Sequence, residues 1–294
     1  MRALAIHEDV IVVVSGVWQT TCTAMRAGGE GLVIDSPILP DELEALPGLL
    51  DQAGFPVDGL LASHGDWDHL LGRIAFPQAS LGLAESTVAR LDAEPGEPQR
   101  RLREFDAEFY LDGRRALGLA GHQPLPVPGR VSLGSAGSAG GSVAAGGGSA
   151  GDSAATAGGF AGRSAATAAG VEIELHQADG HTADGVAFWL PWAEVLVCGD
   201  YLSPVELPMI SAERGGSLTA YRETLFRLSP LINRAATVVP GHGTPLTGER
   251  ALELLAEDLA YLDALASGVE VTLPHGRRTA TQRQIHERNL TARA

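Results

Sequence analysis

Short apolar runs alternate with amphipathic stretches along most of the chain. The runs are rich in Val, Ile and Leu and are closed by Gly, Pro, Asp or Ser, which is typical of buried β-strands. They predict strands at 10–14, 31–34, 57–62, 171–175, 186–190, 195–198 and 237–239. Between them, apolar residues at helical spacing predict helices at 41–51, 85–91, 218–228 and 248–266. Interleaved strands and helices indicate an α/β fold in which helices cover sheets.

Residues 134–170 break this pattern. Of these 37 residues, 31 are Gly, Ala or Ser. Such a segment cannot bury enough apolar surface to offset the entropy lost when it is ordered. We therefore predict a flexible insertion in a surface loop, with a short alanine-rich helix as the alternative. The remaining length suits one domain, so we expect a single domain over 1–294 that contains the insertion.

Charge and composition exclude several classes of protein. The chain has 21 basic residues, all arginine, against 36 acidic residues, which gives a net charge of −15 and argues against a nucleic-acid partner. The sequence has no run of 18 apolar residues, so we expect no membrane span. Two cysteines, Cys22 and Cys198, are too few for a disulfide framework, and we expect a reducing compartment, the cytoplasm.

The densest group of chemically competent side chains follows the strand predicted at 57–62. His64, Asp66, Asp68 and His69 lie within six residues of one another. Imidazole and carboxylate groups bind divalent metals, and a tight loop after a strand can direct several of them at one point. A solvated surface turn is the alternative when this segment is considered alone.

Three further predicted strands end in a similar way. Gly180-His181 follows the strand at 171–175, Gly199-Asp200 follows the strand at 195–198, and Gly241-His242 follows the strand at 237–239. Glycine permits the tight turns and close backbone approach that a crowded polar site needs. Because residues beyond the carboxyl ends of strands form the binding crevice of open sheets, these four loops are expected to converge.

The segment His64-Gly65-Asp66-Trp67-Asp68-His69 resembles the His-x-His-x-Asp-His motif of the metallo-β-lactamase-fold hydrolases. His181, Asp200 and His242 match the later single ligands of that family, so the resemblance covers nearly the whole chain and includes the glyoxalase II-like and lactonase-like members. It implies a four-layer αββα sandwich of the metallo-β-lactamase type. It also implies a site for two divalent metal ions, usually zinc, at one edge between the sheets.

Asp66 stands where the family motif has its second histidine. The resemblance then implies one metal held by His64, Asp66 and His181, another held by Asp68, His69 and His242, and a bridging Asp200. An extra carboxylate makes the site a weaker Lewis acid. It also shifts the preference from Zn²⁺ somewhat toward Mn²⁺ or Fe²⁺. Zinc remains the first expectation, and a loosely held first ion or a single ion stays open.

The resemblance implies a metal-dependent hydrolase with a small-molecule substrate. A metal-bridging hydroxide, oriented by Asp68, would attack a small carbonyl ester, and we favour a thioester or lactone over a β-lactam. One alternative is a phosphodiesterase of the same fold, against which the lack of basic clusters in the central loops counts. The other is a metal-binding member that Asp66 has made non-catalytic. The oligomeric state stays open.

The C-terminal residues 274–290 form the one basic stretch in this acidic chain. They include Arg277, Arg278, Arg283 and Arg288. Such a stretch could cover the active site or bind an anionic group of the substrate. A solvated terminal helix is the commoner outcome for this charge pattern, and it is the structure that we expect.

Overall fold

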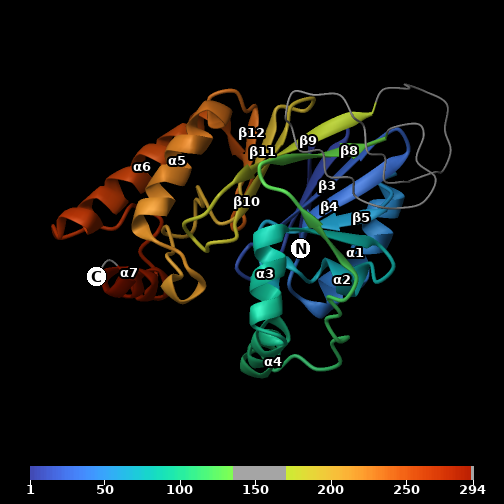
Figure 1. Ribbon diagram of the computed structural model, residues 1–294, viewed down its shortest axis with the longest axis horizontal. Coiled ribbons are helices and arrows are strands. Elements are labelled where there is room, and N and C mark those ends of the chain that lie inside the picture. Colours follow the sequence, from blue (N-terminus) through green and yellow to red (C-terminus); the bar gives the residue numbers. More distant parts are fainter. Residues whose placement is uncertain (135–169, 293–294) are drawn as a thin grey trace.

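The computed structural model describes residues 1–134 and 170–292 of the chain. All but the two end residues of the predicted insertion at 134–170 lie outside the described part. Within it, the strands form two sheets of seven and six strands. The sheets pack face to face, and helices flank both outer faces (Figure 1).

The first sheet is built from the N-terminal half of the chain. Its strands, in spatial order, are β1 (Arg2–His7), β2 (Val10–Val14), β3 (Thr21–Ala27), β4 (Glu30–Asp35), β5 (Gly59–Leu61), β6 (Ser80–Ala84) and β7 (His122–Leu125). Strands β1 to β4 pair antiparallel, whereas β4 to β7 pair parallel. The parallel strands direct their carboxyl ends to one edge of the sheet, where β5 leads into the His64 loop.

The second sheet follows in the chain. Its strands are β8 (Gly129–Leu133), β9 (Val171–Gln177), β10 (Val186–Leu190), β11 (Val195–Val197), β12 (Thr237–Val239) and β13 (Leu246–Thr247). All neighbours pair antiparallel except β11 and β12, which are parallel. The carboxyl ends of β11 and β12 therefore lie side by side.

Helices cover the outer face of each sheet. They are α1 (Pro40–Gln52), α2 (Gly72–Ala75), α3 (Glu85–Ala93) and α4 (Glu97–Glu108) on the first sheet's side, and α5 (Leu218–Ile232), α6 (Gly248–Ser267) and α7 (Ala280–Ala292) on the second sheet's side (Figure 1). Two 3₁₀ turns, Trp67–His69 and Ala212–Arg214, interrupt the loops.

Strand alternation produces three apolar layers. In β2, Val12 and Val14 face the layer between the sheets, whereas Val13 faces the layer beneath α1. Across the molecule, Phe188 of β10 joins the layer between the sheets and Trp189 joins the layer beneath α5 and α6. The expected four-layer αββα sandwich is therefore confirmed.

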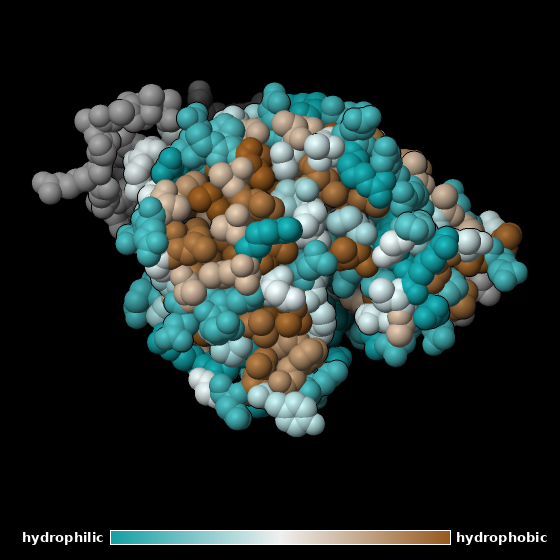
Figure 2. Space-filling view, turned by 180° about the vertical axis from the view of Figure 1, so that it is seen from behind, coloured by the Kyte–Doolittle hydropathy of each residue, from teal (hydrophilic) through white to brown (hydrophobic). Residues whose placement is uncertain are grey.

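The surface mixes polar and apolar side chains. Figure 2 shows apolar patches separated by hydrophilic residues on the face opposite to that of Figure 1. None of the helices in the described ranges is both long and apolar enough to cross a bilayer.

Candidate metal centre

All seven side chains singled out from the sequence meet at one edge of the sandwich. His64 and Asp66 follow β5, and Asp68 and His69 lie on the 3₁₀ turn directly after them. The remaining three come from the second sheet: His181 follows β9, Asp200 follows β11 and His242 follows β12. Their side chains are buried or nearly so. The four loops therefore lie close together, as the sequence predicted.

The first group of potential ligands contains His64, Asp66 and His181, whose ligand atoms lie within 4.8 Å of one another. Oδ2 of Asp66 is 3.8 Å from Nε2 of His64 and 3.8 Å from Nε2 of His181. Atoms at this separation can share one ion placed between them.

The second group contains Asp68, His69 and His242, also within 4.8 Å. Oδ2 of Asp68 lies 3.6 Å from Nε2 of His69 and 3.5 Å from Nε2 of His242. This group is therefore at least as tight as the first.

Asp200 lies between the two groups. Its Oδ2 faces the first group, 3.3 Å from Nε2 of His181 and 3.8 Å from Nε2 of His64. Its Oδ1 faces the second group, 3.3 Å from Nε2 of His69 and 3.5 Å from Nε2 of His242. One carboxylate thus presents a separate oxygen to each group, which is the arrangement of a bridging ligand.

Each of the four imidazoles is held through Nδ1 and directs Nε2 at the centre. Nδ1 contacts Ser63 Oγ in His64 (3.0 Å), Asp35 Oδ2 in His69 (3.1 Å), Met209 O in His181 (2.8 Å) and Trp18 O in His242 (3.2 Å). Such partners fix the ring and leave Nε2 free for a metal.

Three of these inward nitrogens are orphans. Nε2 of His64, His69 and His181 is buried without a hydrogen-bond partner among the residues that the structure describes, and so is Oδ1 of Asp200. Buried polar atoms are nearly always paired because an unpaired one costs free energy. Divalent cations would satisfy all four atoms at once, so the residues present fit a metal centre.

Glycine is required where two of these loops cross. The backbone N–H of Gly241 donates to the carbonyl of Gly199 at 2.6 Å. A Cβ on Gly241 would collide with Oδ1 of Asp200. Gly199 also adopts a left-handed φ of 58°. The glycines before Asp200 and His242 therefore allow the close approach that the sequence predicted.

Asp66 is clamped by two arginines. Arg90 of α3 donates to Oδ1 at 2.6 Å, and Arg214 donates to Oδ2 at 2.7 Å. Burial raises the pKa of Asp66, but the imidazoles of His181 and His64 and the Arg214 guanidinium outweigh burial, so the pKa lies well below its usual range. Asp66 is therefore ionised, and two positive charges partly offset its negative charge.

Sequence reasoning missed the residues that support the ligands. Asp35 accepts the Ser63 N–H at 2.7 Å and contacts His69, and Asp184 accepts the Gly65 N–H at 2.8 Å and pairs with Arg90. The position of Asp35 could have been recognised from the sequence, because it is an aspartate at the end of an apolar strand, β4, just as Asp200 follows the apolar strand β11. The sequence around Arg90 and Arg214 contains no comparable signal, because each is one arginine among many.

Other residues take structural places. The Tyr201 hydroxyl donates to the Ala178 carbonyl and accepts from the His181 N–H at 3.0 Å, so it supports the loop. Cys198 is fully buried and packs as a small apolar residue. His176 is half-buried and lies beside Glu174, away from the seven residues.

The C-terminal basic stretch is not a solvated helix throughout, and that expectation needs correction. Arg277 is only 1% exposed and is paired with Asp258 and Glu257. Gln282, Ile285 and Asn289 of α7 are buried as well. Their spacing places them on one face, which packs against the protein.

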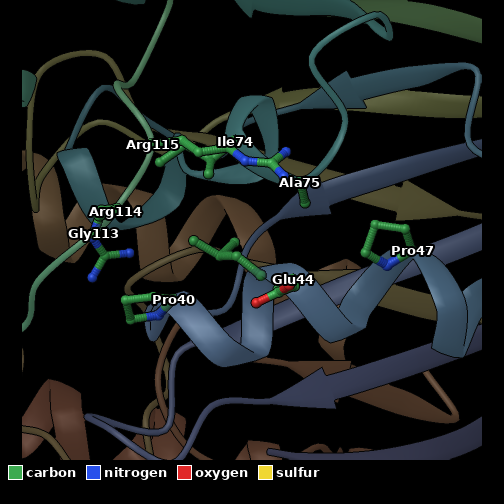
Figure 3. Close-up of a pocket in the computed structure, with 9 residues that line it drawn as sticks. Pro40, Glu44, Pro47, Ile74, Ala75, Gly113, Arg114 and Arg115 are labelled. Atoms are coloured by element: carbon green, nitrogen blue, oxygen red, sulfur yellow. The ribbon is translucent and has the colours of Figure 1, made fainter.

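A cavity of about 440 Å³ lies elsewhere. Figure 3 shows Pro40, Glu44 and Pro47 of α1 on one side of it and Ile74, Ala75 and Arg115 on the other. None of the seven candidate ligand residues lines this cavity. It is therefore separate from the candidate metal centre.

Comparisons with known proteins agree with the architecture. The family model of the metallo-β-lactamase superfamily matches residues 15–81. A metallo-β-lactamase from Pontibacter korlensis superposes with a TM-score of 0.52 at 17% identity, over 89% of this chain and 98% of that one. No curated protein matches the chain.

Two other solved structures show the same fold. The sec-alkylsulfatase Pisa1 from Pseudomonas sp. gives a TM-score of 0.62 at 13% identity, over 90% of this chain but 42% of that one. A di-iron-bound form of TTHA1623 gives 0.53 at 18% identity, over 83% and 97%. These structures share their fold with this chain, and residues 15–81 match the family model of the metallo-β-lactamase superfamily.

Proposed function

We propose that this protein is a metal-dependent hydrolase of small carbonyl esters, with thioesters or lactones as the preferred class. The observation that carries the proposal is the convergence of orphaned imidazole nitrogens on a carboxylate, Asp200, whose two oxygens face two separate ligand groups. His64, Asp66 and His181 would hold one ion, and Asp68, His69 and His242 the other. Zn²⁺ is the first candidate, followed by Mn²⁺ and Fe²⁺.

When bound, divalent ions lower the pKa of water and polarise the carbonyl oxygen of a substrate. The chain's own residues do the positioning. Asp68 supplies a carboxylate beside His69 and His242 that can accept a hydrogen bond from the attacking water. Asp35, Ser63, Met209 and Trp18 keep the four rings in place through Nδ1. No serine or cysteine nucleophile is needed.

The charges around the centre support an uncharged substrate. The two arginines that approach it, Arg90 and Arg214, are both paired with carboxylates, which leaves neither available for an anionic group. Glu206 adds a further partly buried carboxyl group near His242 and Asp200. A phosphodiester or a β-lactam carries a negative charge that needs a cationic partner, whereas a thioester or lactone need not carry one.

Two alternatives keep a specific basis. The same two metal ions could also serve the hydrolysis of a phosphodiester or a sulfate ester. The sulfate ester is included in the test because the chain shares its fold with an alkylsulfatase. A binding role without turnover would follow if the Asp66 clamp prevents the first ion from activating water. The buried thiols of Cys22 and Cys198 support the reducing, cytoplasmic location proposed for this enzyme.

The test combines metal analysis with substrate turnover. Protein purified without chelators is analysed for metal and then assayed on a thioester, a lactone, a β-lactam, a bis-aryl phosphate and an alkyl sulfate. We expect close to two ions per chain and turnover of the thioester or lactone. Asp68→Ala should remove at least about 99% of the activity, since it deletes a ligand and a hydrogen-bond acceptor together. Glu104→Ala, at an exposed acid on α4, is the control.

Turnover of the phosphate or sulfate ester alone would replace the carbonyl-ester proposal. Two tightly held ions without turnover of any substrate would favour the binding role. Protein that takes up no divalent ion would remove the basis of all three functions.

A further inference from the structure

The loop 203–210, between β11 and α5, forms hydrogen bonds with two of the candidate ligand residues. The carbonyl of Met209 accepts the Nδ1–H hydrogen bond of His181 at 2.8 Å. The Ser203 hydroxyl donates to the backbone carbonyl of His242 at 2.7 Å. The position of this loop therefore affects where both imidazoles point.

The C-terminal residues 274–292 hold that loop in place. Gln282 of α7 accepts the Leu207 N–H through Oε1 at 2.6 Å. Nη1 of Arg277 donates to the Glu206 carbonyl at 3.1 Å. Arg277 is itself fixed, because it is buried and paired with Asp258 of α6 at 2.5 Å. The loop is thus bonded to a tail that starts more than sixty residues later in the chain.

Asn289 makes the most specific of these contacts. Its Nδ2 donates to the Pro208 carbonyl at 2.6 Å, and its Oδ1 accepts the Ile210 N–H at 3.0 Å. The side-chain amide of Asn289 therefore bonds the backbone on both sides of Met209, as the backbone of a neighbouring β-strand would. Asn289 is completely buried, and Nδ2 also lies 3.0 Å from the Tyr261 hydroxyl. The carbonyl that orients His181 is fixed from both sides.

The rest of α7 fits this role. Gln282, Ile285 and Asn289 lie on one buried face, whereas Arg283 and Arg288 are exposed. Figure 1 shows α7 at the end of the α5–α6 pair. A buried asparagine and a buried glutamine that both bond one loop are a costly way to pack a terminal helix, since apolar side chains would serve packing alone.

We propose that the C-terminal segment 274–292 belongs to the metal centre, with Asn289 as a positioning residue that sets the orientation of His181 through the Met209 carbonyl. This inference rests on the proposed function in so far as it takes His181 to be a metal ligand. Asn289 does not touch the reacting atoms. It acts on the affinity of the ligand group that contains His64, Asp66 and His181.

The test compares Asn289→Ala and Asn289→Asp with Arg288→Ala, an exposed neighbour on the same helix. Asn289→Asp keeps the acceptor for Ile210 but loses the donor to Pro208. Full-length proteins are titrated with Co²⁺ against a chromophoric chelator. We expect one of the two Co²⁺ equivalents to bind about tenfold more weakly in both Asn289 variants, and the other to stay within about twofold of wild type. Arg288→Ala should match the wild-type protein.

A second measurement does not depend on bound metal. In the metal-free protein, ¹H–¹⁵N NMR of the imidazoles should show the His181 Nδ1–H signal shifted or lost by exchange in the Asn289 variants, and retained in Arg288→Ala. If Asn289→Ala does not fold, Gln282→Ala takes its place beside Asn289→Asp. Folded variants that bind both Co²⁺ equivalents as wild type, with an unchanged His181 signal, would overturn the inference. Wild-type protein that binds no Co²⁺ would instead refute the proposed function, and the NMR comparison would still decide the positioning role.

Discussion

Arg214 donates its hydrogen bond to the same oxygen of Asp66 that faces the first ligand group. Nη1 of Arg214 lies 2.7 Å from Oδ2, and that oxygen lies 3.8 Å from His64 and His181. Arg90 occupies the other oxygen at 2.6 Å. The aspartate that departs from the family motif is thus accompanied by two guanidinium groups. The additional carboxylate of Asp66 by itself predicts a metal site that is a weaker Lewis acid. The two arginines reduce that effect because their positive charges offset part of the negative charge of Asp66.

Replacing Asp66 by histidine tests whether these three residues act as a unit. From the motif alone, Asp66→His should raise zinc affinity. In this structure the imidazole would face two guanidinium groups that no longer have the Asp66 carboxylate between them and the metal, so we expect the first Zn²⁺ to bind at least about tenfold more weakly, which is about 1.4 kcal/mol. Zinc retained after dialysis against a graded series of chelators measures the effect.

The matched double variant is Asp66→His with Arg214→Leu. Removing the cation beside the new imidazole should recover part of the lost zinc affinity, which gives a coupling energy between the two positions. Additive effects would show that Arg214 and Asp66 are independent, and higher zinc affinity in the single variant would contradict the clamp.

Asp35→Asn should weaken the second ligand group without disturbing the fold. Asp35 has a left-handed φ of 60°, which asparagine tolerates, and the new Oδ1 can still accept the Ser63 N–H. The negative charge 3.1 Å from Nδ1 of His69 is lost. We expect a 10- to 100-fold (roughly) lower affinity for one metal equivalent at an unchanged circular dichroism spectrum. If the variant binds both metal equivalents with wild-type affinity, Asp35 does not support His69.

The parts of the site that the sequence predicted share a local signal. His64, Asp66, Asp68 and His69 follow an apolar run directly, and Asp200 and His242 each follow one with a glycine in front. A buried strand has a readable end, and in parallel strands the carboxyl ends share an edge. This geometry allowed convergence to be predicted although the residues are far apart in the chain.

The residues that escaped prediction depend on tertiary neighbours instead. Arg90 and Arg214 acquire their role by meeting Asp66, and Asn289 acquires its role by meeting the loop at 203–210. Strand β1 has exposed and half-exposed residues, and β3 places threonines at buried positions. Neither strand therefore contains the continuous apolar run by which the other strands were predicted. Their hydrogen-bond partners in β2 and β4 decide their structure.

Metal uptake at neutral pH should release protons. Burial lowers the pKa of His242, but the carboxylates of Glu206 and Asp200 outweigh burial and raise it to about 10 in the metal-free protein. This charged imidazole stabilises the metal-free fold fully below the unfolded pKa of about 6.5, and the stabilisation is lost as the pH rises toward 10. Because a metal ligand must be deprotonated, affinity should increase with pH over the same range.

Isothermal titration calorimetry at pH 7.5 in buffers of different ionisation enthalpy measures this release. We expect the observed enthalpy of Zn²⁺ binding to vary linearly with buffer enthalpy, with a slope that corresponds to at least one proton released per chain. His242→Ala should lower the slope. An enthalpy independent of the buffer would contradict the raised pKa of His242.

Deleting residues 135–169 should leave stability and metal binding nearly unchanged. Leu133 of β8 and Val171 of β9 are direct cross-strand partners, so the segment starts and ends at one end of a hairpin. The deletion joins Gly134 to Gly170, and a two-residue Gly-Gly turn suits the twist of antiparallel strands. Gly134 already has a left-handed φ of 79°, and its N–H keeps its bond to Glu30. We expect a melting temperature close to that of the full chain, and a decrease of more than about 8 °C would mean that the segment packs against the domain.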